Sequence, residues 1–197
     1  MKEFIKAIRL TLVFWLLTGI LYPLLILGIA QSIFPITANG SIMLNINDQP
    51  IGSTLIGQGF TTERYFQSRP SAVKYSQGQK AQPYGISGAT NLAPGNLQLI
   101  NRVKEDFEKL KEDNKKPLAE LIYASGSGLD PHISLKAIRE QLPRVLQARG
   151  IKEDDVIPLI KQYTDGRFLG IFGEPGVNIL RLNYALDLQD INRRANN

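Results

Sequence analysis

The chain has 197 residues, with 23 lysines and arginines against 18 aspartates and glutamates, and its net charge is +5. Hydrophobic residues make up 43% of it and charged residues 21%, proportions that exclude an extensively disordered or a fibrous protein. The length allows one domain of ordinary size with a short appendage, and a sequence without cysteine excludes disulfides and thiol chemistry.

An uncharged apolar run follows a short basic flank at the amino terminus. The flank is residues 1–9, and after Arg9 the next charged side chain is Asp48. Residues 10–34 would span about 37 Å as a helix, which exceeds the hydrocarbon core of about 30 Å. A cleavable signal peptide has a shorter apolar stretch, and a core helix rarely stays uncharged for so long. We therefore expect one transmembrane helix over residues 10–34.

The basic residues around this run predict its orientation. Lys2, Lys6 and Arg9 precede it, whereas the next basic residue after it is Arg64. Because positively charged flanks are retained in the cytoplasm, we expect a cytoplasmic amino terminus. Residues 35–197 then form an extracytoplasmic domain of a single-pass protein in the inner or plasma membrane.

The first part of this domain contains a hairpin pattern and a long loop pattern. Apolar residues alternate in SIMLNIN (41–47), turn residues follow in DQPIG (48–52), and a second apolar run is STLIGQ (53–58). This order predicts two paired strands. Residues 67–96 are rich in Gly, Pro, Ser, Asn and Gln without a period, which predicts a loop that is either functional or disordered.

Helical patterns occupy the middle of the domain. Apolar residues at three- and four-residue steps predict an amphipathic helix from Leu97 to about Asn114. A second helix is predicted over Leu135–Arg149, interrupted at Pro143, with Ser134 as its N-cap and Gly150 just past its end. A third is predicted over Asp154–Tyr163. The cluster at 102–116 mixes both charge signs, which is typical of a solvated helix face, so we expect no nucleic acid partner.

Two strand-like runs end the chain. They are RFLGIFGE (167–174) and VNILRLNYALD (177–187), and Pro175-Gly176 between them suits a type II turn. The predicted fold is therefore one amino-terminal transmembrane helix followed by a single soluble α+β domain, with strands or hairpins at its two ends and helices between them.

The stretch SGSGLDPHIS (125–134) contains the only histidine and is the first candidate for chemistry. The sequence has no P-loop, and the Gly126-x-Gly128 pattern reaches Pro131 where a dinucleotide motif needs its last glycine. One histidine without cysteine cannot build the usual zinc cage, and the carboxylates lack the spacing of a calcium loop, so we expect no metal site.

A serine hydrolase is the remaining catalytic interpretation of this stretch. His132 could act with an aspartate and with Ser125, Ser127 or Ser134, but no Gly-x-Ser-x-Gly elbow accompanies them. The simpler interpretation is structural, since Asp130-Pro131 would turn the chain into a helix that Ser134 caps. We favour the structural interpretation and predict no catalytic residue.

Four stretches together resemble the KdpC family of potassium-transporting ATPase subunits. In chain order they are GSTLIGQGFTTERYFQSRPSA (52–72), SGATNLAPGN (87–96), SGSGLDPHIS (125–134) and GEPGVNILRLNYALD (173–187). The resemblance covers nearly the whole chain, and its specificity comes from the four motifs standing in order behind one membrane helix.

The resemblance implies a non-catalytic subunit of a high-affinity potassium pump of the P-type ATPase class. Its implied partners are a channel-like potassium-binding subunit, an ATP-hydrolysing pump subunit and the lipid bilayer. The family is described as a catalytic chaperone that raises the ATP affinity of the pump subunit through a transient ternary complex, so ATP is the one implied ligand and no cofactor is firmly bound. The family-motif candidates for contacting it are Ser87, Asn91, Ser127, Gly128, Asp130 and His132.

ATP lies in the cytoplasm, whereas the basic flank predicts an extracytoplasmic domain. We therefore favour a chaperone effect transmitted through the membrane helices as coupling between sites. The alternative is a subunit that binds ATP directly.

Overall fold

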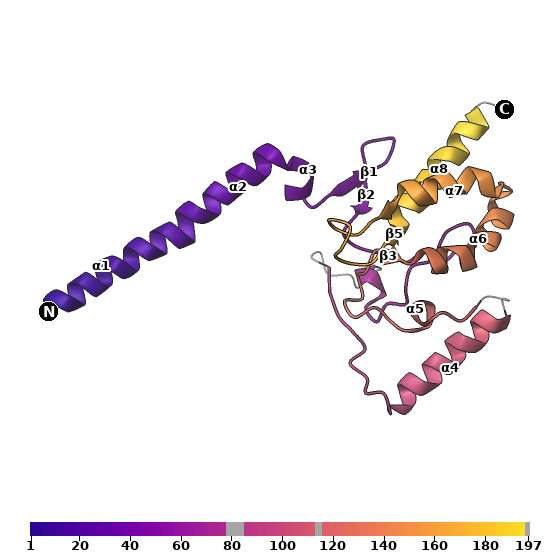
Figure 1. Cartoon of the computed structure of the whole chain (residues 1–197), viewed down its shortest axis with the longest axis horizontal. Coiled ribbons are helices and arrows are strands. Elements are labelled where there is room, and N and C mark those ends of the chain that lie inside the picture. The colour runs from indigo at the N-terminus through magenta and orange to yellow at the C-terminus, as the bar shows by residue number, and fades with distance from the viewer. Residues whose placement is uncertain (78–84, 113–115, 196–197) are drawn as a thin grey trace. The chain divides into compact units, whose positions relative to one another are not determined.

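The computed structural model describes residues 1–77, 85–112 and 116–195 (Figure 1). The chain divides into two compact units, Met1–Ser53 and Thr54–Asn197, each with its own architecture.

A long apolar helix begins the first unit. It comprises α1 (Lys2–Leu16), a π-helical segment η1 (Leu17–Leu21) and α2 (Tyr22–Ile33). The wider π turn ends two residues before Pro23, which lacks the backbone donor that a regular helical turn needs. Over its most apolar window the 32-residue helix has a mean hydropathy of 2.3 and no buried residue. By length and composition, it can cross a membrane.

A short hairpin ends the first unit. Its elements are α3 (Pro35–Ala38), β1 (Ile42–Leu44) and β2 (Pro50–Ser53), and the two strands pair antiparallel. The Asn45 side chain closes the turn, because its Oδ1 accepts hydrogen bonds from the backbone of Asn47 and Gln49 at 2.8 and 2.9 Å. The predicted hairpin is confirmed, but most of its second strand lies in the stretch predicted as turn, and residues 54–58 are irregular.

The second unit combines a small sheet with helices, which confirms the α+β class. The sheet is antiparallel with strand order β3-β5-β4, from β3 (His132–Ile133), β4 (Thr164–Asp165) and β5 (Gly176–Asn178). The helices are α4 (Leu97–Glu112), α5 (Ala119–Ile122), α6 (Leu135–Arg149), α7 (Glu153–Gln162) and α8 (Ile179–Ala195).

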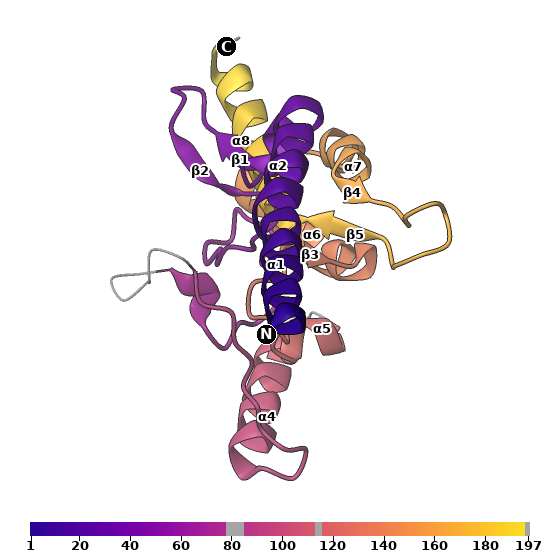
Figure 2. The same cartoon turned by 90° about the vertical axis from the view of Figure 1, so that its left-hand side faces the viewer.

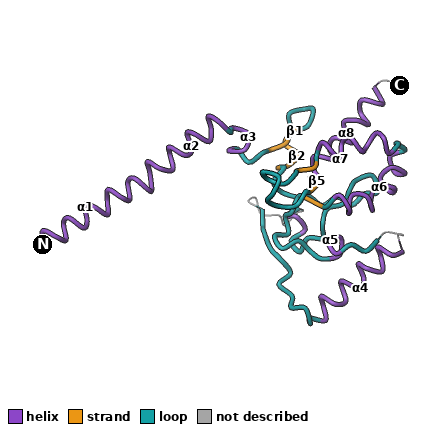
Figure 3. Tube along the Cα trace, in the orientation of Figure 1, coloured by secondary structure: helices purple, strands orange, loops and turns teal. Residues whose placement is uncertain are grey.

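Long loops connect these elements, as Figure 3 shows. The predicted loop at 67–96 is confirmed where it is described and contains one 3-10 turn, η2 (Lys74–Ser76), while its residues 78–84 lie outside the described part. The predicted helices at 97–114 and 154–163 are confirmed as α4 and α7, and residues 113 and 114 lie outside the described part.

The boundaries of α6 follow from its terminal residues. The Ser134 hydroxyl accepts a hydrogen bond from the Ala137 backbone at 3.1 Å, and Gly150 adopts the left-handed conformation with φ of 64°. Ser134 thus satisfies a backbone donor that the first turn leaves free, and Gly150 ends the helix where a side chain would be strained. Both predicted caps are confirmed, but the predicted interruption at Pro143 is wrong, because α6 continues through this residue.

The carboxyl-terminal prediction is wrong. Residues 177–187 were expected to form a strand, but β5 ends at Asn178 and α8 follows at once. The Asn178 side chain caps α8 by accepting from the Arg181 backbone at 3.1 Å. Four residues at helical spacing are buried on one face, namely Ile179, Leu182, Asn183 and Leu186.

The expected strand at 167–174 is also absent. These described residues form a loop with a single bridge between Phe168 and Phe172. Gly176 begins β5 and lacks the positive φ that the predicted type II turn requires at that position.

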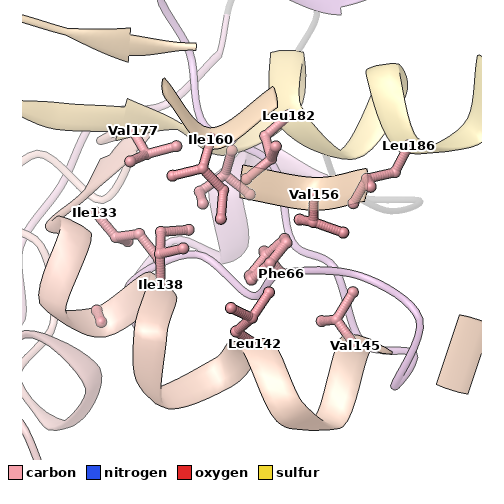
Figure 4. Packing of buried hydrophobic residues seen from close by; sticks show 12 residues of the cluster. Phe66, Ile133, Ile138, Leu142, Val145, Val156, Ile160, Val177, Leu182 and Leu186 are labelled. Atoms are coloured by element: carbon pink, nitrogen blue, oxygen red, sulfur yellow. The ribbon is translucent and has the colours of Figure 1, made fainter. Parts of the chain in front are cut away.

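The core lies between α6, α7, α8 and the sheet (Figure 4). Its fully buried side chains include residues of α6 (Ile138, Val145), α7 (Val156), β5 (Val177) and α8 (Leu182, Leu186). Phe66 is also completely buried, although it belongs to a loop rather than a helix or strand. Burial of these side chains supplies the main favourable term in folding this unit.

Side chains rather than a neighbouring strand hold the segment around Phe66, residues 63–67. Asn183 accepts from the Phe66 nitrogen and donates to its carbonyl, both at 2.9 Å. Gln141 likewise accepts from the Gln67 nitrogen at 2.7 Å and donates to the Gln67 carbonyl at 3.1 Å. Each buried amide therefore replaces the pair of hydrogen bonds that a strand neighbour would supply. We call residues 63–67 the clamped segment.

A buried arginine joins the clamped segment to α6 and α8. The Arg149 side chain is 0% exposed, and its Nη2 and Nη1 lie 2.9 and 2.7 Å from the carboxylates of Asp187 and Asp190. Its Nε donates to the Arg64 carbonyl at 2.6 Å, and its guanidinium lies over the Tyr65 ring at 5.0 Å. Burial, followed by the hydrogen bond to Asp187, raises the pKa of Tyr65, so its hydroxyl remains a donor. Each of the three guanidinium nitrogens of Arg149 therefore donates a hydrogen bond.

We expect Arg149→Met to lower the free energy of unfolding by about 3–5 kcal/mol, because two carboxylates lose the buried cation that balances them. Arg139→Met is the matched control, since Arg139 is exposed on the same helix. The measurement is denaturant unfolding of the full chain followed by circular dichroism. Equal stability of the two variants would contradict the role assigned to Arg149.

Candidate functional site

Loops from distant parts of the sequence meet on one side of the second unit. Three backbone hydrogen bonds join them, Gly57 N to Leu129 O at 2.8 Å, Ser125 N to Pro70 O at 2.9 Å and Gly88 N to Ser127 O at 2.8 Å. We call this meeting point, formed by residues 57, 69–75, 87–88 and 125–130, the loop junction. It brings together the first three motifs identified in the sequence.

Gly128 occupies the centre of the loop junction. Its φ is +67°, and a Cβ there would lie 2.6 Å from both the Gly88 carbonyl oxygen and Val73 Cγ2. The Ser71 hydroxyl donates to the Gly128 carbonyl at 2.7 Å. Only glycine therefore satisfies both the conformation and the close approach at this position.

Gly57 is required for a second close approach. A Cβ at this position would lie 2.5 Å from the Asp130 carbonyl oxygen and 2.6 Å from Tyr75 Cε1. The loop before the clamped segment can therefore lie directly against the turn at Asp130. The motif glycines at 57 and 128 thus have packing roles.

Tyr75, within the loop junction, lies in an unusual backbone turn. Lys74, Tyr75 and Ser76 have φ values of 50°, 55° and 53°, a left-handed conformation that costs L-residues about 1–2 kcal/mol each. The Ser71 hydroxyl holds the turn by accepting from the Tyr75 nitrogen at 3.1 Å, and the Ser76 hydroxyl donates to the Ile86 carbonyl at 2.8 Å. Surrounding hydrogen bonds thus fix a conformation that isolated residues would avoid.

The Tyr75 phenol is buried and acts as a hydrogen-bond donor. Its residue is 7% exposed, and its hydroxyl donates to the Arg69 carbonyl. Burial raises the pKa of Tyr75 to about 12, because the phenolate would lose its hydration. The proton that forms this hydrogen bond therefore stays in place throughout the physiological range.

Asp130 has partners on both of its carboxylate oxygens. Oδ2 lies 3.2 Å from Arg69 Nη1, and Oδ1 accepts from the His132 nitrogen at 3.0 Å. The second contact forms a local turn in which an aspartate side chain bonds the backbone two residues on. These contacts agree with the predicted structural role of the Asp130-Pro131 turn.

The His132 side chain points to an aspartate on another strand. Its Nε2 lies 2.8 Å from Asp165 Oδ2, and Asp165 Oδ1 lies 3.5 Å from Arg181. The three serines of the hydrolase interpretation have other partners, since Ser125 and Ser127 face each other at 3.2 Å and Ser134 bonds Glu120. Among the described side chains, His132 contacts no serine hydroxyl, so the triad interpretation has no geometric support.

The six candidate ligand residues fall into separate groups. Ser87, Ser127 and Gly128 meet in the loop junction, where the Ser87 hydroxyl donates to the Ser127 carbonyl at 3.0 Å. Asp130 lies at its edge beside Arg69, and His132 turns toward Asp165. Asn91 has a φ of 52° and makes no hydrogen bond to another described residue.

A cavity of about 700 Å³ lies beside the loop junction. Arg69 and Lys74 give it positive charge, and Phe60, Tyr75, Leu110 and Leu121 give it apolar walls. The Arg69 Nε has no hydrogen-bond partner within the described ranges. None of the six candidate ligand residues lines this cavity.

The arrangement favours loop assembly over chemistry on a substrate. Most polar groups of the junction already bond to backbone or to one another, as described above. Across residues 1–77, 85–112 and 116–195, no three histidine, cysteine, aspartate or glutamate side chains gather as metal ligands would. The described polar groups of the junction therefore mainly hold its loops against one another.

Sequence reasoning missed Arg69, Tyr75 and Arg149 as organising residues. Arg69 and Tyr75 lie in or beside a family motif, but their roles depend on partners 61 and 6 residues away. Arg149 ends a predicted helix, where a basic residue normally indicates only a favourable terminal charge. No local pattern distinguishes these residues from ordinary surface cations and aromatics.

Comparison with known proteins identifies close relatives. The family profile described as "KdpC: K+-transporting ATPase, c chain" matches residues 4–188. "Potassium-transporting ATPase KdpC subunit 2" of Nostoc sp. is 64% identical over 195 residues, covering 99% of this chain and 98% of that protein. The KdpC subunit of Synechocystis sp. is 51% identical, and the match covers 94% of this chain and 98% of that protein. The KdpC subunit of Caldanaerobacter subterraneus is 41% identical, and the match covers 98% of this chain and 97% of that protein.

We expect Gly128→Ala to lower the free energy of unfolding by about 2–4 kcal/mol, because the new methyl group meets a carbonyl oxygen and the positive φ disfavours alanine. Gly126→Ala is the matched control in the same motif, since a Cβ at 126 meets nothing within 4 Å. Thermal unfolding of the two full-length variants measures the difference. If Gly126→Ala destabilised as much as Gly128→Ala, the close packing at 128 would not be the cause.

Proposed function

Because the chain belongs to the KdpC family of potassium-transporting ATPase subunits, we propose that it is a non-catalytic accessory subunit that stabilises the pump complex and raises the ATP affinity of the pump's ATP-hydrolysing subunit. The observation that carries this proposal is the match over residues 4–188, which includes nearly all of the amino-terminal helix and the whole loop junction. The family membership therefore concerns the complete architecture and not one motif.

The geometry of the loop junction supports a non-catalytic role. Gly128, Ser71 and Tyr75 use their polar groups to hold neighbouring backbone, and His132 pairs with Asp165. A catalytic group needs a free polar atom aimed at a substrate. The arrangement favours a rigid extramembrane body that presents a fixed surface to other subunits.

The proposed partners are the channel-like potassium-binding subunit, the ATP-hydrolysing subunit and the lipid bilayer. The single 32-residue apolar helix supports contact with the bilayer and with helices of the two subunits. Three basic residues at its amino-terminal end, Lys2, Lys6 and Arg9, support a cytoplasmic amino terminus and an extracytoplasmic second unit.

This orientation determines how the chain could affect ATP binding. ATP is cytoplasmic, so an extracytoplasmic domain would act by favouring one conformation of the pump rather than by touching the nucleotide. The alternative is direct ATP binding in a ternary complex. The cationic wall of the 700 Å³ cavity, with Arg69 and Lys74, is the observation in its favour.

We expect a pump assembled without this chain to need about 5- to 150-fold more ATP for half-maximal hydrolysis, the range typical of coupling between sites, and to be recovered in lower yield. Adding the purified chain back should restore both. The measurement is the ATP dependence of potassium-stimulated hydrolysis in detergent. Unchanged ATP dependence and unchanged yield would reject the proposal, while saturable binding of labelled ATP to the chain alone would favour the alternative.

We expect protease added to intact spheroplasts to cleave the second unit, and protease added to inverted membrane vesicles to leave it intact. An epitope tag before Met1 should show the opposite pattern and serves as the control for sealed membranes. Immunoblotting of the fragments is the measurement. Cleavage only from the cytoplasmic side would overturn the orientation and support direct contact with ATP.

A further inference from the structure

The loop between β4 and β5 exposes four large apolar side chains. They are Phe168, Leu169, Ile171 and Phe172, which are 71%, 74%, 73% and 62% exposed. In Figure 2 this connection extends beyond the neighbouring α7 and β5. Exposed apolar residues scattered singly are ordinary, but four within five positions form a patch that water disfavours.

The loop has a fixed shape despite its exposure. The Phe168 nitrogen donates to the Phe172 carbonyl at 2.8 Å, and the Phe172 nitrogen donates back to Phe168 at 3.0 Å. Leu169, Gly170 and Gly173 have φ values of 53°, 74° and 84°, which fold the tip tightly. A left-handed leucine is strained, and such strain is retained mainly where a site requires the shape. The backbone that carries the apolar side chains is thus held in one turn before any partner arrives.

The charges near the loop favour a protein partner over a lipid surface. Residues 165–174 contain one basic side chain, Arg167, and two acidic ones, Asp165 and Glu174, with no tryptophan or tyrosine. Segments that bind membrane surfaces combine apolar residues with several lysines or arginines, which attract anionic lipid. This loop lacks that cationic component, and a fluid bilayer does not require a preformed turn.

We propose that residues 167–173 are a docking element that inserts into an apolar recess on another subunit of the pump. The proposal rests on the proposed function, because it requires that the chain assembles with such subunits. The tip is too small to form a whole interface, so it acts as a hot spot within a larger contact. Phe168 and Phe172 provide the aromatic anchors, and their pinned backbone reduces the entropy lost on docking.

The test uses the full chain co-expressed with the other pump subunits and purified through a tag on this chain. The variant Leu169→Asn with Ile171→Gln removes two apolar side chains, and asparagine is well tolerated at positive φ, so the turn is preserved. Leu97→Gln is the matched control, because Leu97 is also 74% exposed but lies on α4. A photo-reactive benzoylphenylalanine replacing Ile171 in the wild-type background reports what the tip touches.

We expect recovery of the other subunits to fall about tenfold in the double variant and to stay at the wild-type level in Leu97→Gln, with equal melting temperatures for all three chains. The photo-reactive residue should crosslink to one pump subunit. Undiminished recovery, an equal fall in the control, or crosslinking to lipid alone would overturn the docking element while leaving the proposed function intact. If the wild-type chain recovered no other subunit, both proposals would fail.

Discussion

The second unit depends on one constraint: Phe66, in the clamped segment, is completely buried without a neighbouring strand. A buried peptide group without a hydrogen bond is costly, so something must replace the missing sheet. Asn183 from α8 and Gln141 from α6 each bond both the donor and the acceptor of one residue in this segment. Phe66 can then enter the core between these helices, and α6 and α8 are held at a fixed separation by polar and apolar contacts together.

The loop junction extends the same principle toward the candidate site. The clamped segment is followed, after Ser68, by residues 69–75, in which Arg69 contacts Asp130 and Ser71 contacts Gly128. Two glycines allow the backbones to touch, and hydroxyls from Ser71 and Ser76 hold the left-handed turn. The result is an extensive loop surface that keeps one shape, which is what an accessory subunit needs in order to present fixed contacts to other proteins.

The sequence predicts those parts whose causes are local. The limits of α6 follow from Ser134 and Gly150, and the first hairpin follows from alternation around a turn. The run 177–187 was misread because its dense apolar residues fit a strand and a helix alike, and only the Asn178 cap indicated the helix. The motif residues Ser87, Ser127 and Gly128 meet as neighbours, but the amide clamp and the burial of Arg149 could not be predicted, because they depend on residues far apart in the chain.

The clamp also has a consequence for the order of synthesis. Phe66 and Asn183 are 117 residues apart, so the second unit cannot close until nearly all of the chain has been made. Contacts of such long range slow folding. Until α8 has been made, the peptide groups of Phe66 lack the Asn183 side chain and stay exposed to water. The apolar amino-terminal helix, by contrast, is complete after the first 33 residues and needs no later segment to form. Membrane insertion can therefore precede folding of the second unit, and the growing chain would be tethered at the bilayer before its core forms.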